Sequence, residues 1–418
     1  MKQKEVSKMS EEKILIIAVK KQEQNQERFD SSLEELISLS KTAGGTVEKV
    51  ITQNRNRIHP ATYIGEGKIA EIKKEIDQLE IDLVISNDEL SAGQLRNLTN
   101  HFQIRLIDRS QLILDIFAQR ARTKEGKLQV ELAQLQYLLP RLYGQGAAMS
   151  RLGAGIGTRG PGETKLETDQ RHIRQRITDI KRRLNMVVKQ REQYRKRRKT
   201  DVFQIAIVGY TNAGKSTLFN RLTNSNSLEE DQLFATLDPL TRKIQLPSGF
   251  ETLITDTVGF LQELPTALIA SFRSTLEEVT EADFLLHIVD SSHIDQEQHQ
   301  DTVMELLEDL GANTIPMLTV YNKKDLIKED LIPINHPCIF ISAYEQWDIE
   351  QLLKKVEDIL KAEWDRYSLN LNPEEGKTLH RLLRETIVHE KHFKEEENQY
   401  IVKGYIQSDH PLQRLLKE

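Results

Sequence analysis

The sequence contains almost no cysteine and no long hydrophobic run. Cys338 is the single cysteine in 418 residues, which excludes a disulfide framework and a zinc site built from cysteines. The longest apolar runs, such as residues 14–19, are far too short to span a bilayer. The N-terminus is charged and has none of the apolar core of a signal peptide. We therefore expect a cytoplasmic protein without stable insertion into a membrane.

The chain also lacks an overall excess of basic charge. It has 58 Lys+Arg against 64 Asp+Glu, a net charge of −6, which argues against a protein that coats nucleic acid. The charge is uneven, however, because residues 165–199 hold 14 basic and 4 acidic residues, or +10, and the remainder of the chain is −16. Such a run is most often a solvated helix face. Here it follows a glycine-rich segment, 144–162, so we expect a basic projection that contacts RNA. The predicted RNA-contacting residues are Arg151, Arg159, Arg191, Arg195, Arg197 and Arg198.

The length predicts about three domains, and the pattern along the chain refines this. Strand-like runs alternate with amphipathic stretches in two regions, which is typical of α/β domains with parallel sheets. In the first region the predicted strands are residues 14–19, 82–86 and 104–108. Between them, leucines at 128, 132, 135, 139 and 142 and apolar residues at 173, 177, 180, 184 and 187 predict one apolar seam on each of two helices. The predicted division is a polar tail (1–12), an α/β domain (13–120), a helical hairpin with a glycine-rich loop (121–199), a second α/β domain (200–367) and a small α+β domain (368–418).

A phosphate-binding loop follows the predicted strand 203–208. Residues 209–216 match the pattern Gly-x-x-x-x-Gly-Lys-Ser and open a helix, the context that this motif requires. The glycines let backbone N–H groups face phosphate oxygens, Lys215 supplies a charge at the β- and γ-phosphates, and Ser216 offers a hydroxyl to Mg²⁺. The nucleotide-binding residues predicted here are Gly209, Tyr210, Thr211, Asn212, Ala213, Gly214, Lys215, Ser216 and Thr217.

Two further segments complete the predicted phosphate site. Asp256 ends a strand and is expected to hold Mg²⁺ through a water, while the N–H of Gly259 meets the γ-phosphate. Thr236 lies between the two motifs, where a switch loop brings a second hydroxyl to Mg²⁺. We assign catalytic roles to Lys215, Thr236 and Gly259. The nucleotide-binding residues of these segments are Phe234, Ala235, Thr236, Leu237, Asp238, Asp256, Thr257, Val258 and Gly259.

The base is predicted to be guanine. Asp325 can accept hydrogen bonds from N1–H and the 2-amino group of guanine, whereas adenine would leave its carboxylate unpaired. The stem of Lys323 covers the base, and a backbone N–H after the last strand meets O6. The residues concerned are Asn322, Lys323, Lys324, Asp325, Ser342, Ala343 and Tyr344.

Phe260 occupies the position where many small GTPases carry a water-orienting glutamine. We expect a hydrophobic plug there, slow intrinsic hydrolysis and acceleration by a partner. Asn212 resembles the asparagine by which some P-loop GTPases hold an activating potassium ion, so K⁺ is a second expected cofactor.

Together these segments resemble the HflX family of translation-factor-related GTPases. The resemblance covers roughly residues 13–367, and the final 50 residues carry no recognisable motif. The segments that carry it are 209–216, 234–239, 256–260, 322–325 and, outside the GTPase domain, 63–68, 122–141, 157–163 and 272–278. The resemblance implies a GTPase that binds the large ribosomal subunit, with its N-terminal domain and hairpin near the peptidyl-transferase centre. It also implies that the GTP form splits stalled ribosomes under stress, and that ATP is hydrolysed as well.

The sequence therefore predicts a Mg²⁺-dependent, monomeric GTPase with a doubly wound, mostly parallel sheet, which binds GTP/GDP and RNA. The resemblance adds the large ribosomal subunit and its ribosomal RNA as the expected partners. Two alternatives stay open. One is an RNA-remodelling NTPase with a second, ATP site in the N-terminal domain, and the other is a GTP-switched scaffold for a protein partner.

Overall fold

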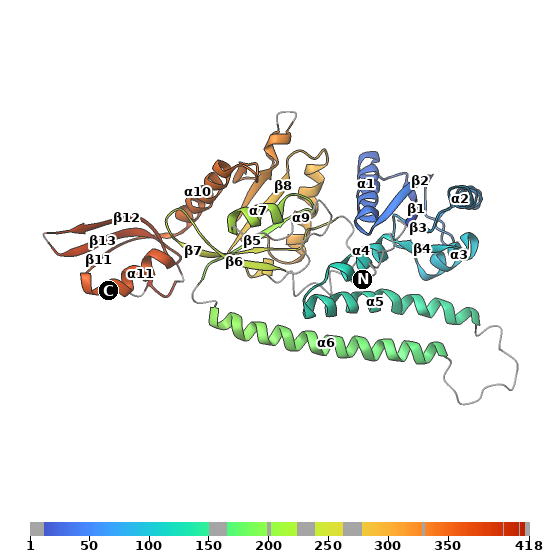
Figure 1. Cartoon of the computed structure of the whole chain (residues 1–418), viewed down its shortest axis with the longest axis horizontal. Coiled ribbons are helices and arrows are strands. Elements are labelled where there is room, and N and C mark those ends of the chain that lie inside the picture. The colour runs from blue at the N-terminus through green and yellow to red at the C-terminus, as the bar shows by residue number, and fades with distance from the viewer. Residues whose placement is uncertain are drawn as a thin grey trace, which may run out of the picture. The chain divides into compact units, whose positions relative to one another are not determined.

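A computed structural model describes residues 12–149, 165–198, 202–223, 239–261, 278–327, 331–395, 397–408 and 410–413. The chain forms two compact units, the first comprising residues up to Asn185 and the second most of the residues from Met186 onward. Figure 1 shows their helices and strands. None of the described helices has both the length and the apolar composition needed to cross a bilayer.

The first unit contains a four-stranded parallel sheet with strand order β2-β1-β3-β4. Its central strand is apolar throughout residues 14–19, all of them buried. The sequence predicted β1, β3 and β4 but not β2. This edge strand has four exposed residues among its eleven, and only Ile51 is buried. The strands are β1 (Glu12–Lys21), β2 (Gly45–Arg55), β3 (Leu83–Ser86) and β4 (Arg105–Asp108), and the helices are α1 (Gln26–Thr42), α2 (Glu66–Leu79), α3 (Ala92–Phe102) and α4 (Arg109–Arg120).

Local sequence explains where these helices begin. α2 begins directly after Gly65, as expected for a glycine turn ahead of a helix. Ser91 and Gln94 form a capping box at the start of α3, in which each side chain accepts the other residue's backbone N–H. The Asp108 side chain caps α4 by accepting the N–H of Gln111. β4 therefore passes directly into α4, because Asp108 both ends the strand and caps the helix.

Two long helices follow, α5 (Lys124–Met149) and α6 (Lys165–Arg198). They run antiparallel (Figure 1), and Arg176 of α6 donates to both carboxylate oxygens of Glu131 of α5, at 2.6 and 2.9 Å. The predicted leucine seam is only partly right, because Leu132 alone among its five leucines is buried. The buried line of α5 runs instead through Val130, Ala133 and Tyr137, since α5 packs on α3 and α4 as well as lying along α6.

The second unit is built on a six-stranded sheet with strand order β10-β9-β8-β5-β7-β6. All neighbours pair in parallel except β6 and β7, so the predicted doubly wound, mostly parallel fold is confirmed. Its strands are β5 (Gln204–Gly209), β6 (Leu240–Gln245), β7 (Glu251–Asp256), β8 (Phe284–Asp290), β9 (Met317–Asn322) and β10 (Cys338–Phe340). Its helical segments are α7 (Lys215–Thr223), α9 (Gln296–Asp309), η1 (Lys324–Leu326) and α10 (Gln346–Glu363).

The end of the chain is an α+β part, as the sequence predicts. A three-stranded antiparallel sheet has strand order β11-β13-β12. Tyr367, Leu382 and Val402 are among the residues of its own small core. The elements are β11 (Asp365–Leu371), η2 (Pro373–Glu375), α11 (Gly376–Glu385), β12 (Ile387–Lys394) and β13 (Gln399–Ile406). The domain boundaries expected from the sequence stay predictions.

Candidate nucleotide-binding site

The phosphate-binding loop connects the carboxyl end of β5 to the first turn of α7. Two of its glycines are required because residues of β8 and β9 lie too close to the loop to leave room for a side chain. A Cβ atom on Gly209 would lie 2.3 Å from the carbonyl oxygen of Ile288, and one on Gly214, whose φ is +91°, would lie 2.2 Å from Nδ2 of Asn322. Any larger residue would push the loop away from β8 and β9. The loop therefore keeps its backbone N–H groups together ahead of the helix N-terminus, a site suited to phosphate.

Lys215 is the first residue of α7, and its side chain is buried. Its Nζ donates to the carbonyl oxygen of Tyr210 at 2.6 Å, so it lies across the loop. Burial lowers the pKa of Lys215 to about 8, against the opposing effect of the Asp256 carboxylate. Nearby phosphate oxygens would favour the charged amine, because an opposite charge stabilises it. We therefore expect a bound nucleotide to raise the pKa of Lys215 and keep its amine fully protonated.

Ser216 and Asp256 bring two oxygen groups together beside this lysine. The Ser216 hydroxyl donates to the Asp256 carboxylate at 2.8 Å, joining the first turn of α7 to the end of β7. Hydroxyl and carboxylate oxygens are hard ligands, which Mg²⁺ prefers, and P-loop GTPases generally use this ion. The donor set fits it. The predicted third group, Thr236, lies outside the described residues, as do Phe234, Ala235, Leu237 and Asp238.

Gly259 and Phe260 connect the end of β7 to the phosphate-binding loop. A Cβ atom on Gly259 would lie 2.7 Å from Cγ2 of Thr211 and 3.0 Å from Nζ of Lys215, so only glycine fits. The Phe260 N–H donates to Gly209 at 3.2 Å, and the Thr211 N–H donates to Phe260 at 2.8 Å. The Phe260 side chain is only 1% exposed. This position supplies a buried ring to the protein and no polar group for orienting water.

Asn322 joins the phosphate-binding loop to the base-recognition segments. Its amide donates to the carbonyl oxygen of Ala213 at 2.9 Å and accepts the N–H of Ala343 at 3.0 Å. Asp325 follows in η1 with an exposed side chain, which leaves its carboxylate accessible to a base. The structure thus brings three predicted segments together through one asparagine, and each was recognised separately in the sequence.

Two aspartates support these segments and were missed from the sequence. Asp290, at the end of β8, accepts from Lys323 at 2.6 Å. Burial alone would raise the pKa of Asp290, but hydrogen bonds from Lys323 and Ser292 outweigh burial and lower it. Asp348 accepts the Ser342 N–H at 2.7 Å. The only sequence signal for Asp290 was its place at the carboxyl end of a strand, where α/β proteins gather functional side chains.

Histidines around the phosphate-binding loop were also missed. The His299 ring stacks on Tyr210, with ring centroids 3.7 Å apart and planes 7° from parallel. Burial, together with the neighbouring His293, lowers the pKa of His299 to about 4. His287, on β8, is buried, and burial with the nearby Lys215 charge lowers its pKa to about 4 as well. Both rings are therefore neutral at physiological pH. Tyr344, a predicted residue of the base site, is exposed, and Cζ of Arg221 lies 5.7 Å from the centre of its ring.

Family models match three consecutive parts of the chain. Their descriptions are "GTP-binding GTPase N-terminal" for residues 30–118, "GTP-binding GTPase Middle Region" for 120–198 and "50S ribosome-binding GTPase" for 204–323. The chain is 54% identical over 394 residues to GTPase HflX of Alkalihalophilus pseudofirmus, covering 94% of this chain and 93% of that one. The chain belongs to the HflX GTPase family. It binds GTP and hydrolyses it.

HflX proteins of other bacteria are also similar to this chain. GTPase HflX of Escherichia coli strain K12 is 45% identical over 359 residues, 84% of each chain. Among solved structures, a GTP-binding protein from the archaeon Sulfolobus solfataricus in complex with GDP is 24% identical and covers 83% of this chain and 98% of that one, with a TM-score of 0.42. The assignment rests on the sequence relatives.

Four of the six predicted RNA-contacting residues of this HflX protein fall in α6. The backbone of the stretch containing Arg191, Arg195, Arg197 and Arg198 is helical, whereas Arg151 and Arg159 lie outside the described residues. Arg171, Arg174 and Lys181 to Arg183 are exposed along the described part of the same helix. The placement of the four arginines on RNA stays a prediction.

Proposed function

We propose that this HflX protein binds the large ribosomal subunit through its basic hairpin and splits or rescues stalled ribosomes under stress in the cytoplasm. The observation that carries the proposal is the hairpin itself. α6 has 34 residues, which gives a length of about 50 Å at 1.5 Å per residue. Over this length it concentrates 13 basic and 4 acidic residues, a charge of +9, in a chain that is otherwise acidic. A long helix of this charge is suited to phosphate contacts and RNA shape.

The GTPase site supports a partner that accelerates hydrolysis. Lys215 and the Gly259 N–H hold the γ-phosphate in the proposed reaction, and the Asp325 carboxylate holds guanine. The buried Phe260 ring offers nothing to the attacking water. We propose that a group from the ribosome, or a rearrangement that the ribosome induces, positions that water.

Magnesium belongs to the proposal as the cofactor held by Ser216, Thr236 and, through water, Asp256. When bound, the ion offsets negative charge between the β- and γ-phosphates. We propose that GTP orders the segments around Thr236 and Gly259 and that hydrolysis releases them. Potassium is proposed at Asn212, which is exposed and adopts a left-handed conformation with φ of +61°. Hydrolysis should be faster in K⁺ than in Na⁺, and equal rates would remove this cofactor.

Sedimentation with large subunits in a non-hydrolysable GTP analogue or in GDP tests the proposal. We expect co-sedimentation with the analogue, weaker binding with GDP and a steep loss of binding as salt rises. Charge reversal of Arg195, Arg197 and Arg198 together should weaken binding and flatten its salt dependence. The matched control reverses three exposed lysines outside α6, namely Lys73, Lys74 and Lys377.

Two results would contradict the proposal. Turnover of GTP that does not change when large subunits are added would remove the ribosome as the activating partner. Binding that is equally insensitive to the arginine and lysine reversals would leave α6 as a solvated face only.

A further inference from the structure

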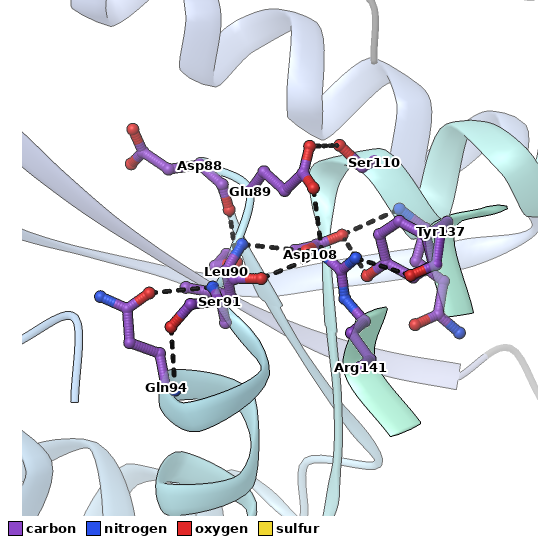
Figure 2. Close-up of polar contacts among 11 residues, drawn as sticks. Asp88, Glu89, Leu90, Ser91, Gln94, Asp108, Ser110, Tyr137 and Arg141 are labelled. Carbon is purple, nitrogen blue, oxygen red and sulfur yellow. Dashed lines mark hydrogen bonds and ion pairs between the residues drawn. The ribbon is translucent and has the colours of Figure 1, made fainter. Parts of the chain in front are cut away.

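At the carboxyl ends of β3 and β4, the edge of the four-stranded sheet is occupied by side chains from α5. In open α/β sheets this edge is where ligands usually bind. Here the segments that follow β3 and β4 meet Tyr137 and Arg141, which point toward Asp108 (Figure 2). A ligand at this part of the edge would have to displace α5. The position that usually serves a ligand therefore holds the first helix of the hairpin.

Asp108 is the centre of this contact. It is the last residue of β4 and has no solvent exposure. Its carboxylate accepts four hydrogen bonds, two from backbone N–H groups of the α/β part, Leu90 at 3.0 Å and Gln111 at 2.9 Å. The other two come from α5, the Tyr137 hydroxyl at 2.7 Å and the Arg141 guanidinium at 3.0 Å. One buried carboxylate thus joins the end of the sheet to the hairpin.

Arg141 adds contacts that restrict the angle of α5 further. It donates to the carbonyl oxygen of Leu90 at 2.9 Å and pairs with Glu89 at 3.2 Å, while its guanidinium lies 3.4 Å from the centre of the Tyr137 ring. Glu89 in turn accepts from Ser110 at 3.1 Å (Figure 2). The Arg141 side chain is 10% exposed. Burial, with the Asp108 charge beside it, raises the pKa of Tyr137, which keeps its hydroxyl protonated as a donor.

Such a cluster restricts geometry more than apolar packing does. Apolar surfaces tolerate sliding, because their attraction is not directional. A buried carboxylate loses hydrogen bonds whenever its donors move, and the cost of an unpaired buried charge is large. α5 also packs on α3 and α4, and its apolar residues Val130, Leu132 and Ala133 are buried, so the polar cluster is not needed merely to attach it. What the polar cluster adds is that it favours one angle of α5 to the sheet.

The same edge explains two sequence segments that the GTPase site does not use. Tyr137 and Arg141 belong to the segment 122–141. Tyr63 opens the segment 63–68, and its hydroxyl accepts the Val19 N–H at 3.0 Å and donates to Asp88, close to Glu89. Tyr63 is buried and adopts a left-handed conformation with φ of +63°. Both segments therefore organise the carboxyl edge of the sheet.

We propose that Asp108, Tyr137 and Arg141 form a positioning joint that holds the hairpin at one angle to the α/β sheet, so that its basic helix α6 reaches its RNA site. This inference rests on the proposed function for its consequence but not for the joint itself. The three residues act through the hairpin and touch no reacting atom. Their loss should uncouple large-subunit binding from GTP hydrolysis without changing hydrolysis by the isolated protein.

The joint can be measured directly in the full-length protein. Spin labels are attached to Lys73→Cys on α2 and Asp169→Cys on α6, both exposed positions, after Cys338→Ser removes the native thiol. We expect one narrow distance distribution by double electron–electron resonance. Tyr137→Phe combined with Arg141→Met should at least double its width. Tyr137→Phe alone, which loses one hydroxyl, provides a milder variant if the double variant does not fold, and should broaden it by a smaller amount.

Function is tested with the same variants without labels. Stimulation of GTP hydrolysis by large subunits should fall at least fivefold in the double variant, while unstimulated turnover stays within twofold. Arg141→Lys, which keeps a donor, should restore part of the stimulation lost in Arg141→Met. Ile76→Ala is the control for lost stability, because Ile76 is buried in α2, which packs on α3 and β2, and makes none of the Asp108 contacts. It should keep both the narrow distribution and the stimulation.

The outcomes separate the joint from the proposed function. An unbroadened distribution in the double variant overturns the joint. A broadened distribution with full stimulation overturns its role in reaching the ribosome. If large subunits fail to stimulate even the parent protein, the proposed function fails while the distance measurement still decides the joint.

Discussion

Replacing Phe260 by glutamine is a sharp test of how the catalytic position is built. A comparison with other GTPases predicts that glutamine restores a water-orienting group and raises the hydrolysis rate. The structure predicts the opposite, because the Phe260 side chain is 1% exposed and its backbone is hydrogen-bonded to Gly209 and Thr211 on the phosphate-binding loop. A glutamine held by the same backbone would enter the protein interior and not the nucleotide site.

The magnitude follows from burial. Truncating a buried phenylalanine to alanine typically costs about 3–5 kcal/mol. Glutamine regains part of the lost packing but buries an amide, which costs about 1–3 kcal/mol if it finds no partners. We therefore expect a loss of about 3–5 kcal/mol in the free energy of unfolding. This is a large share of the roughly 5–15 kcal/mol that stabilises a typical domain.

Urea unfolding and single-turnover GTP hydrolysis, measured without ribosomes, test both parts. Phe260→Leu is the matched control, since it keeps an apolar side chain and should cost only about 1 kcal/mol. Intrinsic hydrolysis should stay the same or fall in both variants. A tenfold rise in rate for Phe260→Gln with an unchanged unfolding midpoint would refute the reasoning, because the side chain would then have reached the nucleotide at no cost to the core.

Three further changes test other parts of the second unit and of the loop geometry. Asp325→Asn should lower GTP affinity by at least ~100-fold and favour a xanthine nucleotide, because the 2-oxo group of xanthine accepts a hydrogen bond from the new amide. Competition with a fluorescent nucleotide measures both affinities. An unchanged preference for GTP would exclude the contact between Asp325 and the base. His287, with its pKa lowered to about 4, stays neutral in the folded protein while the unfolded chain takes up a proton below about pH 6.5, so stability should fall as pH drops from 6.5 to 4, by about 1 kcal/mol per pH unit. In urea titrations at several pH values, His287→Leu should reduce the slope of the free energy of unfolding against pH by the contribution of one proton. Equal slopes in the variant and the parent protein would show that His287 does not titrate in this way. Gly209→Ala places a Cβ atom 2.3 Å from the Ile288 carbonyl oxygen. It should lower the free energy of unfolding by at least about 1–3 kcal/mol and abolish GTP binding. The control Gly67→Ala, whose Cβ atom would meet nothing within 4 Å, should be neutral or slightly stabilising in thermal unfolding.

The nucleotide site was predictable because its chemistry lies in short contiguous segments. The spacing of Gly209, Gly214 and Lys215 reflects a loop whose backbone geometry is set locally, and so does the position of Asp256 at the end of a strand. Supporting groups were missed because nothing local marks them. Asp290 and His299 reach the site only because β8 and α9 lie beside the phosphate-binding loop.

The alternating apolar runs similarly determined the fold class, since a parallel sheet needs buried apolar strands and connecting helices. The edge strand β2 escaped detection because four of its eleven residues are exposed and only Ile51 is buried. The leucine seam of α5 was misjudged because helical periodicity does not say which neighbour each face meets. Packing on α3 and α4 buries Val130, Ala133 and Tyr137 instead.

By itself the sequence determined a guanine-nucleotide site, a parallel α/β framework and a strongly basic helix, since each depends on residues close together in the chain. Only the tertiary structure showed that Asp108 holds Tyr137 and Arg141, which lie 29 and 33 positions further along. It also showed that Asn322 joins Ala213 to Ala343. Hydrogen bonds between distant segments depend on which elements the topology places together, and a short sequence pattern does not contain that information.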